Sequence, residues 1–377
     1  MKRILAFLLL LAMCLSLFAC GNTEEPPVPD TEKEDDKEEE KVIEDRTYLL
    51  KDITDSLKLH GRTSVTEDGI ACDLSATGIE FSAYIEGEVK ISISVSRPSN
   101  GASTNTYFTV YIDEVRQDTR FNIKSGSETL TIASFEEGGV HNIRVLKQTE
   151  AANSLSVFEA LSFKGYFEKA PAKKDLLIEF LGDSITSGFG NMCMNGASDA
   201  GSALNQDATQ TYAYLAAEKL GADHSLVSCS GIGIAGSWCG DFVMKDFFTT
   251  ESYYRSTSEK YEKTFTPDIV VINLGTNDFS KGSSVTQFKV GVKALINLIR
   301  NTYGEDVKIV WAANMMGECM QTYSKSVIAS LGGEANGLYM CTLTENRQGG
   351  YYHPNKAAHV AAAEALAKFI NEKVLSE

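Results

Sequence analysis

Two short segments of this sequence contain the side-chain types that together can break an ester. Ser184 lies in Gly182–Ile185 (GDSI), directly after a strongly apolar run, and His353 precedes Pro354 near the end of the chain. A serine becomes a nucleophile when a base within hydrogen-bond reach removes its proton. Backbone N–H groups in the turn that carries Ser184 also favour negative charge. We therefore expect Ser184 to be the nucleophile and His353 its base.

Two further turns could hold the negative charge that develops on the carbonyl oxygen. Gly231 lies in a glycine-rich turn, Ser228–Asp241, where backbone can approach a ligand closely and donate an N–H. Asn277 follows the apolar run Ile269–Leu274 and offers a side-chain N–H. Together with the N–H of Ser184, these groups would form an oxyanion hole with three donors.

Each candidate also has a purely structural explanation. Ser184 or Asp183 could cap a helix, and Asn277 and Asp278 could do no more than shape a turn. A histidine before a helix is usually an ordinary surface residue, yet no other histidine follows a buried strand in a comparable turn. The other four histidines are His60, His141, His224 and His359.

The elements that must position these residues fall into two regions. In the first, residues 47–168, apolar and polar residues alternate with a period of two, and Gly, Asn, Ser and Pro separate the runs. This pattern predicts an antiparallel β-sandwich or jelly roll. The alternating runs are Ile79–Gly87, Val89–Arg97, Tyr107–Val115, Leu130–Phe135, His141–Thr149 and Leu155–Phe167.

The second region, residues 175–377, follows the polar linker Glu168–Asp175 and has the pattern of an α/β domain. Continuous apolar runs alternate with amphipathic helices such as Val285–Gly304 and Asn355–Val374. Such runs predict a mainly parallel sheet covered by helices on both faces. Ligands bind at the carboxyl ends of the strands in these sheets, which is where the candidate residues fall.

The order of the four motifs resembles the SGNH (GDSL-like) hydrolase superfamily. The residues that match its marked positions are Ser184, Gly231, Asn277 and His353, and the resemblance covers about residues 175–374. With a β-sandwich in front, the chain looks like carbohydrate esterase family 2. This resemblance implies a jelly roll followed by an SGNH domain that removes acetyl groups from polysaccharides such as xylan and glucomannan, without metal or other cofactor.

One part of the superfamily pattern is missing. An acidic residue usually stands two or three residues before the histidine, but those positions are Tyr351 and Gly350. Some members of carbohydrate esterase family 2 use a Ser–His dyad, so the resemblance implies that a backbone carbonyl or an aromatic contact orients His353. Tyr351 and Tyr352 could pack against the imidazole. Glu345 is an alternative that would require the loop to fold back.

Several aromatic residues are candidates for sugar binding. Trp238 lies in the loop after the glycine turn and could stack on a sugar ring, and Tyr351 and Tyr352 are further candidates. Trp311 lies inside a predicted strand and is expected in the core. Two other functions remain open: an inactive glycan-binding surface protein, or a hydrolase of lipids or thioesters. A purely structural surface component is a further alternative, which the motifs disfavour.

The first 46 residues differ from the rest. Lys2 and Arg3 precede an apolar run from Ile4 to Phe18, which predicts an export signal in residues 1–20. Leu17–Cys20 (LFAC), followed by Gly21, resembles a bacterial lipobox, which predicts lipid on Cys20 and anchoring to the outer face of a bacterial cell membrane; an ordinary cleaved signal peptide is the alternative. Residues 21–46 hold twelve acidic and four basic residues, which predicts a disordered tether. The net charge of −16 argues against nucleic acid binding. The oligomeric state cannot be read from the sequence.

Cysteine spacing gives no sign of a metal site. No C-x-x-C pair occurs, so a zinc site is not expected. Six cysteines follow the predicted signal, and an exported chain could pair some of them as disulfides. Buried free thiols are an equal alternative.

Overall fold

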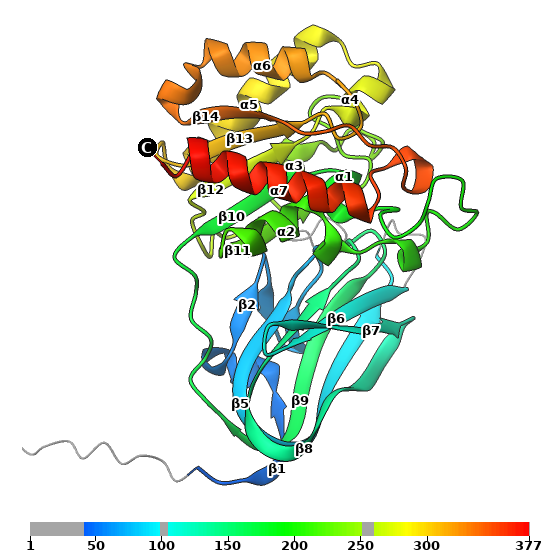
Figure 1. Cartoon of the computed structure of the whole chain (residues 1–377), viewed down its shortest axis with the longest axis vertical. Coiled ribbons are helices and arrows are strands. Elements are labelled where there is room, and N and C mark those ends of the chain that lie inside the picture. The colour runs from blue at the N-terminus through cyan, green and yellow to red at the C-terminus, as the bar shows by residue number, and fades with distance from the viewer. Residues whose placement is uncertain (1–40, 99–104, 251–259, 377) are drawn as a thin grey trace, which may run out of the picture. The chain divides into compact units, whose positions relative to one another are not determined.

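The β domain of the computed structural model curves its strands around a single apolar core (Figure 1). The structure describes residues 41–98, 105–250 and 260–376. The strands are β1 (Glu44–Leu49), β2 (Lys58–His60), β3 (Ser64–Thr66), β4 (Gly69–Ala71), β5 (Gly78–Ser96), β6 (Thr106–Ile112), β7 (Val115–Ile123), β8 (Gly126–Lys147) and β9 (Leu155–Phe167).

All nine strands of this domain belong to one antiparallel sheet, in the order β3-β4-β9-β5-β8-β6-β7, with β1 on β9 and β2 on β5. In β5, Phe81, Ile91 and Ile93 are buried while their neighbours Ser82 and Ser92 are not fully buried, as the period of two predicts. Register shifts in β5 mark bulges, which bend a strand and increase its twist. The predicted antiparallel domain is confirmed.

The N-terminal boundary of the β domain differs from the prediction. Residues 21–46 were expected as tether, yet β1 begins at Glu44, and Glu44 pairs with Gly165 on β9. The side chains of Asp45 and Arg46 remain exposed. Composition could not reveal this strand, because backbone pairing at an edge requires no apolar side chain. The predicted signal, residues 1–20 with Cys20, lies outside the described residues.

The α/β domain contains a five-stranded parallel sheet in the order β11-β10-β12-β13-β14. Its strands are β10 (Leu177–Gly182), β11 (Asp223–Ser228), β12 (Ile269–Asn273), β13 (Lys308–Ala313) and β14 (Leu338–Thr342). Its helices are α1 (Ser184–Ser187), α2 (Tyr212–Lys219), α3 (Met244–Phe248), α4 (Thr276–Lys281), α5 (Val285–Tyr303), α6 (Gln321–Ser330) and α7 (Lys356–Lys373).

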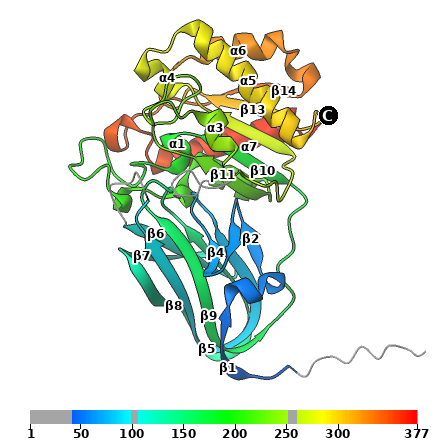
Figure 2. The ribbon, with the colours of Figure 1, turned by 180° about the vertical axis from the view of Figure 1, so that it is seen from behind.

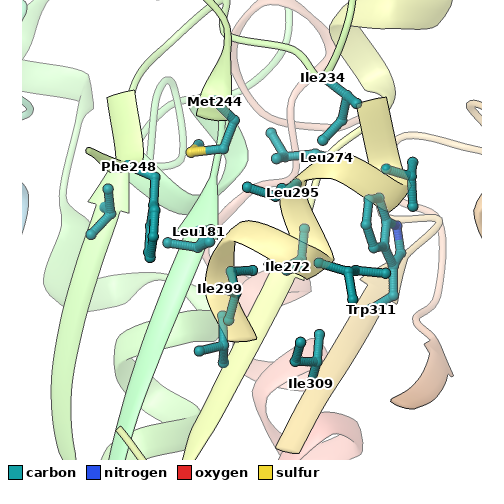
Figure 3. Close-up of a cluster of buried hydrophobic side chains, with 14 of the residues drawn as sticks. Leu181, Ile234, Met244, Phe248, Ile272, Leu274, Leu295, Ile299, Ile309 and Trp311 are labelled. Carbon is teal, nitrogen blue, oxygen red and sulfur yellow. The ribbon is translucent and has the colours of Figure 1, made fainter. Parts of the chain in front are cut away.

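Both faces of this sheet are covered, as the continuous apolar runs predict. Phe180 and Leu181 are adjacent in β10, so their side chains point to opposite faces. Phe180 belongs to a cluster with α2 and α7, and Leu181 belongs to a cluster with α3 and α5. Figure 3 shows the second cluster, where Leu295 and Ile299 of α5 lie over the sheet.

The order of strand addition switches sides at β10, because the next strand, β11, lies on one side of β10 and the following strand, β12, lies on the other. The loops that follow these three strands therefore separate at the carboxyl ends of the strands, which is where α/β proteins bind ligands. Figure 2 shows β10 and β11 and the helices beside them from behind. Within the described helices, none is both long and apolar enough to span a membrane.

An arginine of the β domain is buried in the α/β domain. Arg62 follows β2, and its guanidinium donates to both carboxylate oxygens of Glu179 on β10, at 3.0 and 3.1 Å. It also donates to the carbonyl of Phe248, at 2.7 Å, and lies over the ring of Tyr261, 3.9 Å from its centroid. The Tyr303 hydroxyl completes the cluster by donating to Glu179 at 2.7 Å.

Candidate active site

Ser184 is placed by a sharp turn at the end of β10. Gly182 is required there, because a Cβ at this position would lie 1.9 Å from Oγ1 of Thr186. Asp183 caps the short helix α1 by accepting from the N–H of Ile185 at 3.0 Å. Ser184 is then the first residue of α1 and remains 7 % exposed. The capping that was considered for Asp183 is therefore real, and it holds Ser184 at the carboxyl end of the strand.

His353 meets Ser184 from the other end of the sequence. Its Nε2 lies 2.8 Å from Oγ of Ser184. Its Nδ1 lies 3.1 Å from the carbonyl oxygens of both Gly350 and Tyr351. Carbonyl oxygens only accept, so Nδ1 carries the ring proton and Nε2 is left to accept from the serine hydroxyl. This is the tautomer that a general base requires.

Backbone conformation brings these carbonyls to the imidazole. Tyr351 and Tyr352 have φ values of 50° and 60°, in the left-handed region that non-glycine residues rarely occupy. Gly350 donates its N–H to the carbonyl of Gly190 at 2.8 Å, which fixes the turn to the loop after α1. A Cβ on Gly350 would lie 2.8 Å from the sulfur of Cys193. The strained turn is therefore held by close packing.

No carboxylate contacts the imidazole within the described part of the chain. Glu345 pairs instead with Arg347, at 2.8 Å, and both side chains are about half exposed. The ring that packs on His353 belongs to Phe189, 5.0 Å between centroids, and Tyr351 packs on Phe189 at 6.0 Å. Burial lowers the pKa of His353 below 6.5, although the two carbonyls partly offset this effect.

Gly231 lies in the turn after β11 with a φ of 87°, a conformation that favours glycine. Its carbonyl accepts from the N–H of Trp238 at 2.8 Å, so the loop closes on itself. A Cβ on Gly231 would lie 3.0 Å from Cβ of Trp238. Among the described residues, the N–H groups of Ser184 and Gly231 have no hydrogen-bond partner. Both donors are therefore available to a ligand.

Asn277 lies in the first turn of α4, directly after β12. Its Nδ2 donates to the carbonyl of Ile232 at 2.8 Å and lies 3.2 Å from Oδ2 of Asp183. Its neighbour Asp278 accepts from three successive backbone N–H groups, Ile234, Ala235 and Gly236, at 2.7–2.9 Å. The predicted turn-shaping role of Asp278 therefore extends to the glycine turn, 42 or more residues earlier in the chain.

Asp183 is fully buried beside Asn277. Burial raises the pKa of its carboxyl to about 7, the N–H of Ile185 opposes the shift, and the charges of Asp278 and Glu150 add to it. A carboxyl with a pKa near neutrality therefore belongs to the residue that directly precedes Ser184.

A carboxylate from the β domain supports the glycine turn. Glu150 lies in the loop between β8 and β9, is 3 % exposed, and accepts from the N–H and the hydroxyl of Ser230 at 2.7 and 2.6 Å. It also accepts from the hydroxyl of Ser187 on α1 at 3.3 Å. One side chain therefore fixes both the turn before Gly231 and the helix that Ser184 begins.

Comparison with known proteins identifies the family of this chain. Residues 180–372 match the GDSL-like lipase/acylhydrolase family, and residues 59–171 match the carbohydrate esterase 2 N-terminal domain. The chain belongs to the GDSL-like lipase/acylhydrolase family. It is a carboxylic ester hydrolase with the two-domain organisation of the family 2 carbohydrate esterases.

Two curated relatives are similar to this chain in sequence. The cellulase/esterase CelE of Acetivibrio thermocellus is 29 % identical over 273 residues, which are 67 % of this chain but only 33 % of that protein. The chain therefore matches about one third of the length of CelE. An acetylxylan esterase / glucomannan deacetylase of Cellvibrio japonicus is 23 % identical over 97 % of both chains.

Solved structures agree with the fold. A family two carbohydrate esterase from Clostridium thermocellum, in complex with cellohexaose, has a TM-score of 0.76 and 25 % identity, covering 84 % of this chain and 99 % of that one. The acetyl xylan esterase Est2A of Butyrivibrio proteoclasticus has a TM-score of 0.77 at 19 % identity, covering 88 % and 98 %.

The predicted sugar-binding aromatic residues are all exposed. Trp238, Tyr351 and Tyr352 are 62, 59 and 63 % exposed. The Trp238 indole donates to the hydroxyl of Ser280 at 3.0 Å, and the ammonium of Lys281 lies 4.0 Å from its ring. The indole of Trp238 is therefore held by two neighbours and still lies largely open to solvent. Trp311, by contrast, is completely buried, as predicted.

Two residues of this site were not expected. Glu150 contacts Ser230, and Phe189 packs on His353, both from loops that contain no recognisable motif.

Proposed function

We propose that this chain removes acetyl groups from a polysaccharide or oligosaccharide through a Ser184–His353 dyad. The observation that carries the proposal is the 2.8 Å contact between Nε2 of His353 and Oγ of Ser184, with Nδ1 already satisfied by two carbonyls. The substrate class is taken from the relatives, which are an acetylxylan esterase / glucomannan deacetylase and an esterase bound to cellohexaose.

The first half of the reaction transfers the acetyl group to the enzyme. Oγ of Ser184 attacks the ester carbonyl while Nε2 of His353 accepts its proton. The carbon–oxygen bond to the sugar then breaks, and the sugar oxygen leaves with the proton from Nε2. The second half reverses these roles: water attacks the acetyl-Ser184 ester, gives its proton to Nε2, and acetate leaves as the serine regains that proton.

The oxyanion would be held by three donors. The N–H groups of Ser184 and Gly231 are free to receive it, and removing one such donor typically reduces kcat by about 10²–10³-fold. The amide of Asn277 currently donates to the protein, so we infer that its longer contact, 3.2 Å to Asp183, is exchanged for the oxyanion in the reaction. The 2.8 Å bond to Ile232 keeps the amide in place during this exchange.

Carbonyl groups in place of a carboxylate should stabilise the transition state less. The imidazolium that forms in the transition state is stabilised by an ionised acid in a triad, whereas Gly350 and Tyr351 offer only the negative ends of two peptide dipoles. The dyad should therefore be slower than a triad of the same geometry. It keeps the orienting function, because the carbonyls fix both the tautomer and the ring plane.

Acetate release from acetylated xylan, acetylated glucomannan and a small aryl acetate tests the proposal. Ser184→Ala and His353→Ala should each reduce kcat by about 10³-fold or more, and the double variant should be no worse than either, because the residues act as a unit. Near wild-type hydrolysis by either variant would exclude the dyad.

The same assay separates the competing functions. A wild-type protein that binds cellohexaose but releases no acetate would be a glycan-binding protein. A wild-type protein that hydrolyses a long-chain ester faster than acetylated xylan would be a lipid hydrolase. A glycan deacetylase should release acetate from the polysaccharide and hydrolyse the long-chain ester slowly.

We also propose that the enzyme acts outside the cell on a lipid anchor, with the acidic segment as its tether. This proposal rests on the Ile4–Cys20 pattern alone. Incorporation of labelled fatty acid into the wild-type chain and its loss in Cys20→Ser would support it. Equal labelling of both chains, or none, would contradict it.

A further inference from the structure

Two cysteine thiols flank the turn that carries Gly231. Cys229 directly follows β11, and Cys239 lies at the other end of the loop, beside Trp238. Their sulfur atoms are 3.8 Å apart, and both lie close to the same carbonyl, that of Ser230, at 3.6 and 3.5 Å. The loop backbone is already closed between them by the bond from the N–H of Trp238 to the carbonyl of Gly231.

The two thiols differ in their access to solvent, and the more exposed one has a lowered pKa. Cys229 is 1 % exposed, whereas Cys239 is partly exposed. The thiol of Cys229 and the hydroxyl of Ser237 lower the pKa of Cys239 to about 7, although burial opposes the shift. Burial raises the pKa of Cys193, Cys319 and Cys341 instead. A partly exposed thiol with a low pKa is the one that reacts first with a disulfide.

We propose that Cys229 and Cys239 form a reversible disulfide that closes the loop carrying Gly231 and Trp238. None of the six cysteines in the described ranges is in a disulfide in this structure. A disulfide requires an S–S distance of about 2.05 Å, so the sulfurs must approach by less than 2 Å. The loop already brings the two side chains together, and only this short final movement is needed.

The oxidant is a disulfide donor, and the reaction is thiol–disulfide exchange. The thiolate of Cys239 attacks one sulfur of the donor, which forms a mixed disulfide and releases the first donor thiol. Cys229 loses its proton and attacks the sulfur of Cys239, which forms the protein disulfide and releases the second donor thiol. Two electrons pass from the cysteine pair to the donor, and a dithiol reverses the reaction.

Closure should stabilise the loop without displacing it. The closed loop contains eleven residues, since it runs from Cys229 to Cys239. For a chain of this size, a loop of that length raises the midpoint of thermal unfolding by on the order of 4 °C. Because the loop presents Gly231 and Trp238, esterase activity should also survive heating better in the oxidised protein.

The test uses the full chain, incubated with oxidised glutathione or with dithiothreitol, then blocked and digested. The expected result is a cross-linked Cys229–Cys239 peptide, lighter than the two thiol peptides by two hydrogen atoms, in the oxidised sample alone. Cys239→Ser should abolish this product and the rise in unfolding midpoint. Cys193→Ser, a matched change of another partly exposed thiol, should retain both.

Three results would overturn the proposal. The first is a Cys229 thiol that is still alkylated after oxidation. The second is a stable glutathione adduct on Cys239 with no intramolecular product. The third is a disulfide between other cysteines. The test does not depend on the Cys229→Ser variant, because Cys229 is buried and its replacement could impair folding. The test counts thiols, so its outcome is independent of whether the dyad is correct.

Discussion

The carboxylate of Glu150, a residue of the β domain, holds the N–H of Ser230, the residue before Gly231, at 2.7 Å. The same carboxylate accepts from the Ser230 hydroxyl at 2.6 Å. Hydrogen bonds to a charged group are about twice as strong as those between neutral groups. The β domain therefore contributes to the position of a proposed oxyanion donor and is more than a passive attachment.

Glu150→Gln should lower kcat more than it alters KM. Glutamine keeps the shape but loses the charge that holds the turn, so we expect a fall in kcat of about 10-fold, which corresponds to ~1.4 kcal/mol, with KM within about twofold. Affinity for a boronic acid that mimics the tetrahedral intermediate should fall in parallel. Glu159→Gln is the control, because Glu159 lies in the same domain and accepts from Ser127. A lower unfolding midpoint with unchanged kcat would mean that Glu150 is only structural.

The contributions of Arg62 and Glu179 to the free energy of unfolding should be strongly coupled. Both side chains are at most 1 % exposed, and removing one partner of a buried ion pair typically costs about 3–5 kcal/mol in the free energy of unfolding. Arg62→Met and Glu179→Met should each show this loss, while the double variant should lose much less than the sum. Urea unfolding of all four chains gives the coupling free energy. Lys90→Met, which breaks the exposed pair with Glu88, should have no measurable effect, and additive losses would refute the coupling.

Asp183 should make stability fall as pH rises toward neutrality. Its pKa is about 7 in the folded chain against 3.8 in the unfolded one, so the folded state holds its proton longer. The contribution is fully present below about pH 4 and is lost as pH rises through 7, and over that range it amounts to on the order of 3 kcal/mol. Asp183→Asn should remove this dependence. Urea unfolding of both chains between pH 4 and 8 would measure it, and parallel curves would contradict the assignment.

Glu345→Ala should leave activity within about twofold of wild type. The Glu345 carboxylate pairs with Arg347 and contacts neither nitrogen of His353. The pH profile of kcat/KM should keep its acid limb below 6.5 in both chains, because burial lowers the pKa of His353. A loss of about 10²-fold or more, or an acid limb that moves in the variant, would show that the carboxylate orients the base after all.

Trp238→Ala should weaken binding of polymer without affecting the chemistry. We expect the exposed Trp238 indole to stack on a sugar ring, so KM for acetylated xylan should rise by about 10-fold while kcat for a small aryl acetate stays unchanged. Alanine retains the Trp238 backbone bond to Gly231. Val290→Ala, at an exposed apolar position of α5, should change neither constant. An equal loss on both substrates would mean that Trp238 supports the oxyanion turn and does not bind sugar.

The placement of Ser184, Gly231 and Asn277 was predictable because local signals determine it. A buried apolar run must end at the edge of a parallel sheet, and GDS, the glycine turn and GTND each follow such a run. The structure brings Ser184 and His353 together across 169 residues of sequence. That contact could be inferred only because a serine without a base has no catalytic use.

The supporting contacts could not be predicted in the same way. Glu150 reaches Ser230 across 80 residues and a domain boundary, and nothing in its loop distinguishes it from the other acidic residues. The ring on His353 was expected from Tyr351 or Tyr352 but comes from Phe189, because left-handed backbone at both tyrosines leaves their side chains exposed. Strand β1 was missed because an exposed edge strand carries no apolar pattern.

The support of His353 by the carbonyls of Gly350 and Tyr351 also has an evolutionary consequence. An aspartate can be lost by one nucleotide change, but a peptide carbonyl is present whatever side chain its residue bears. Selection can act only on the path of the main chain. That path depends here on the absence of a side chain at Gly350 and on the positive φ of Tyr351. A search of related sequences for a missing acid would therefore count such enzymes as defective, although the group that replaces the acid is invisible to any comparison of side chains.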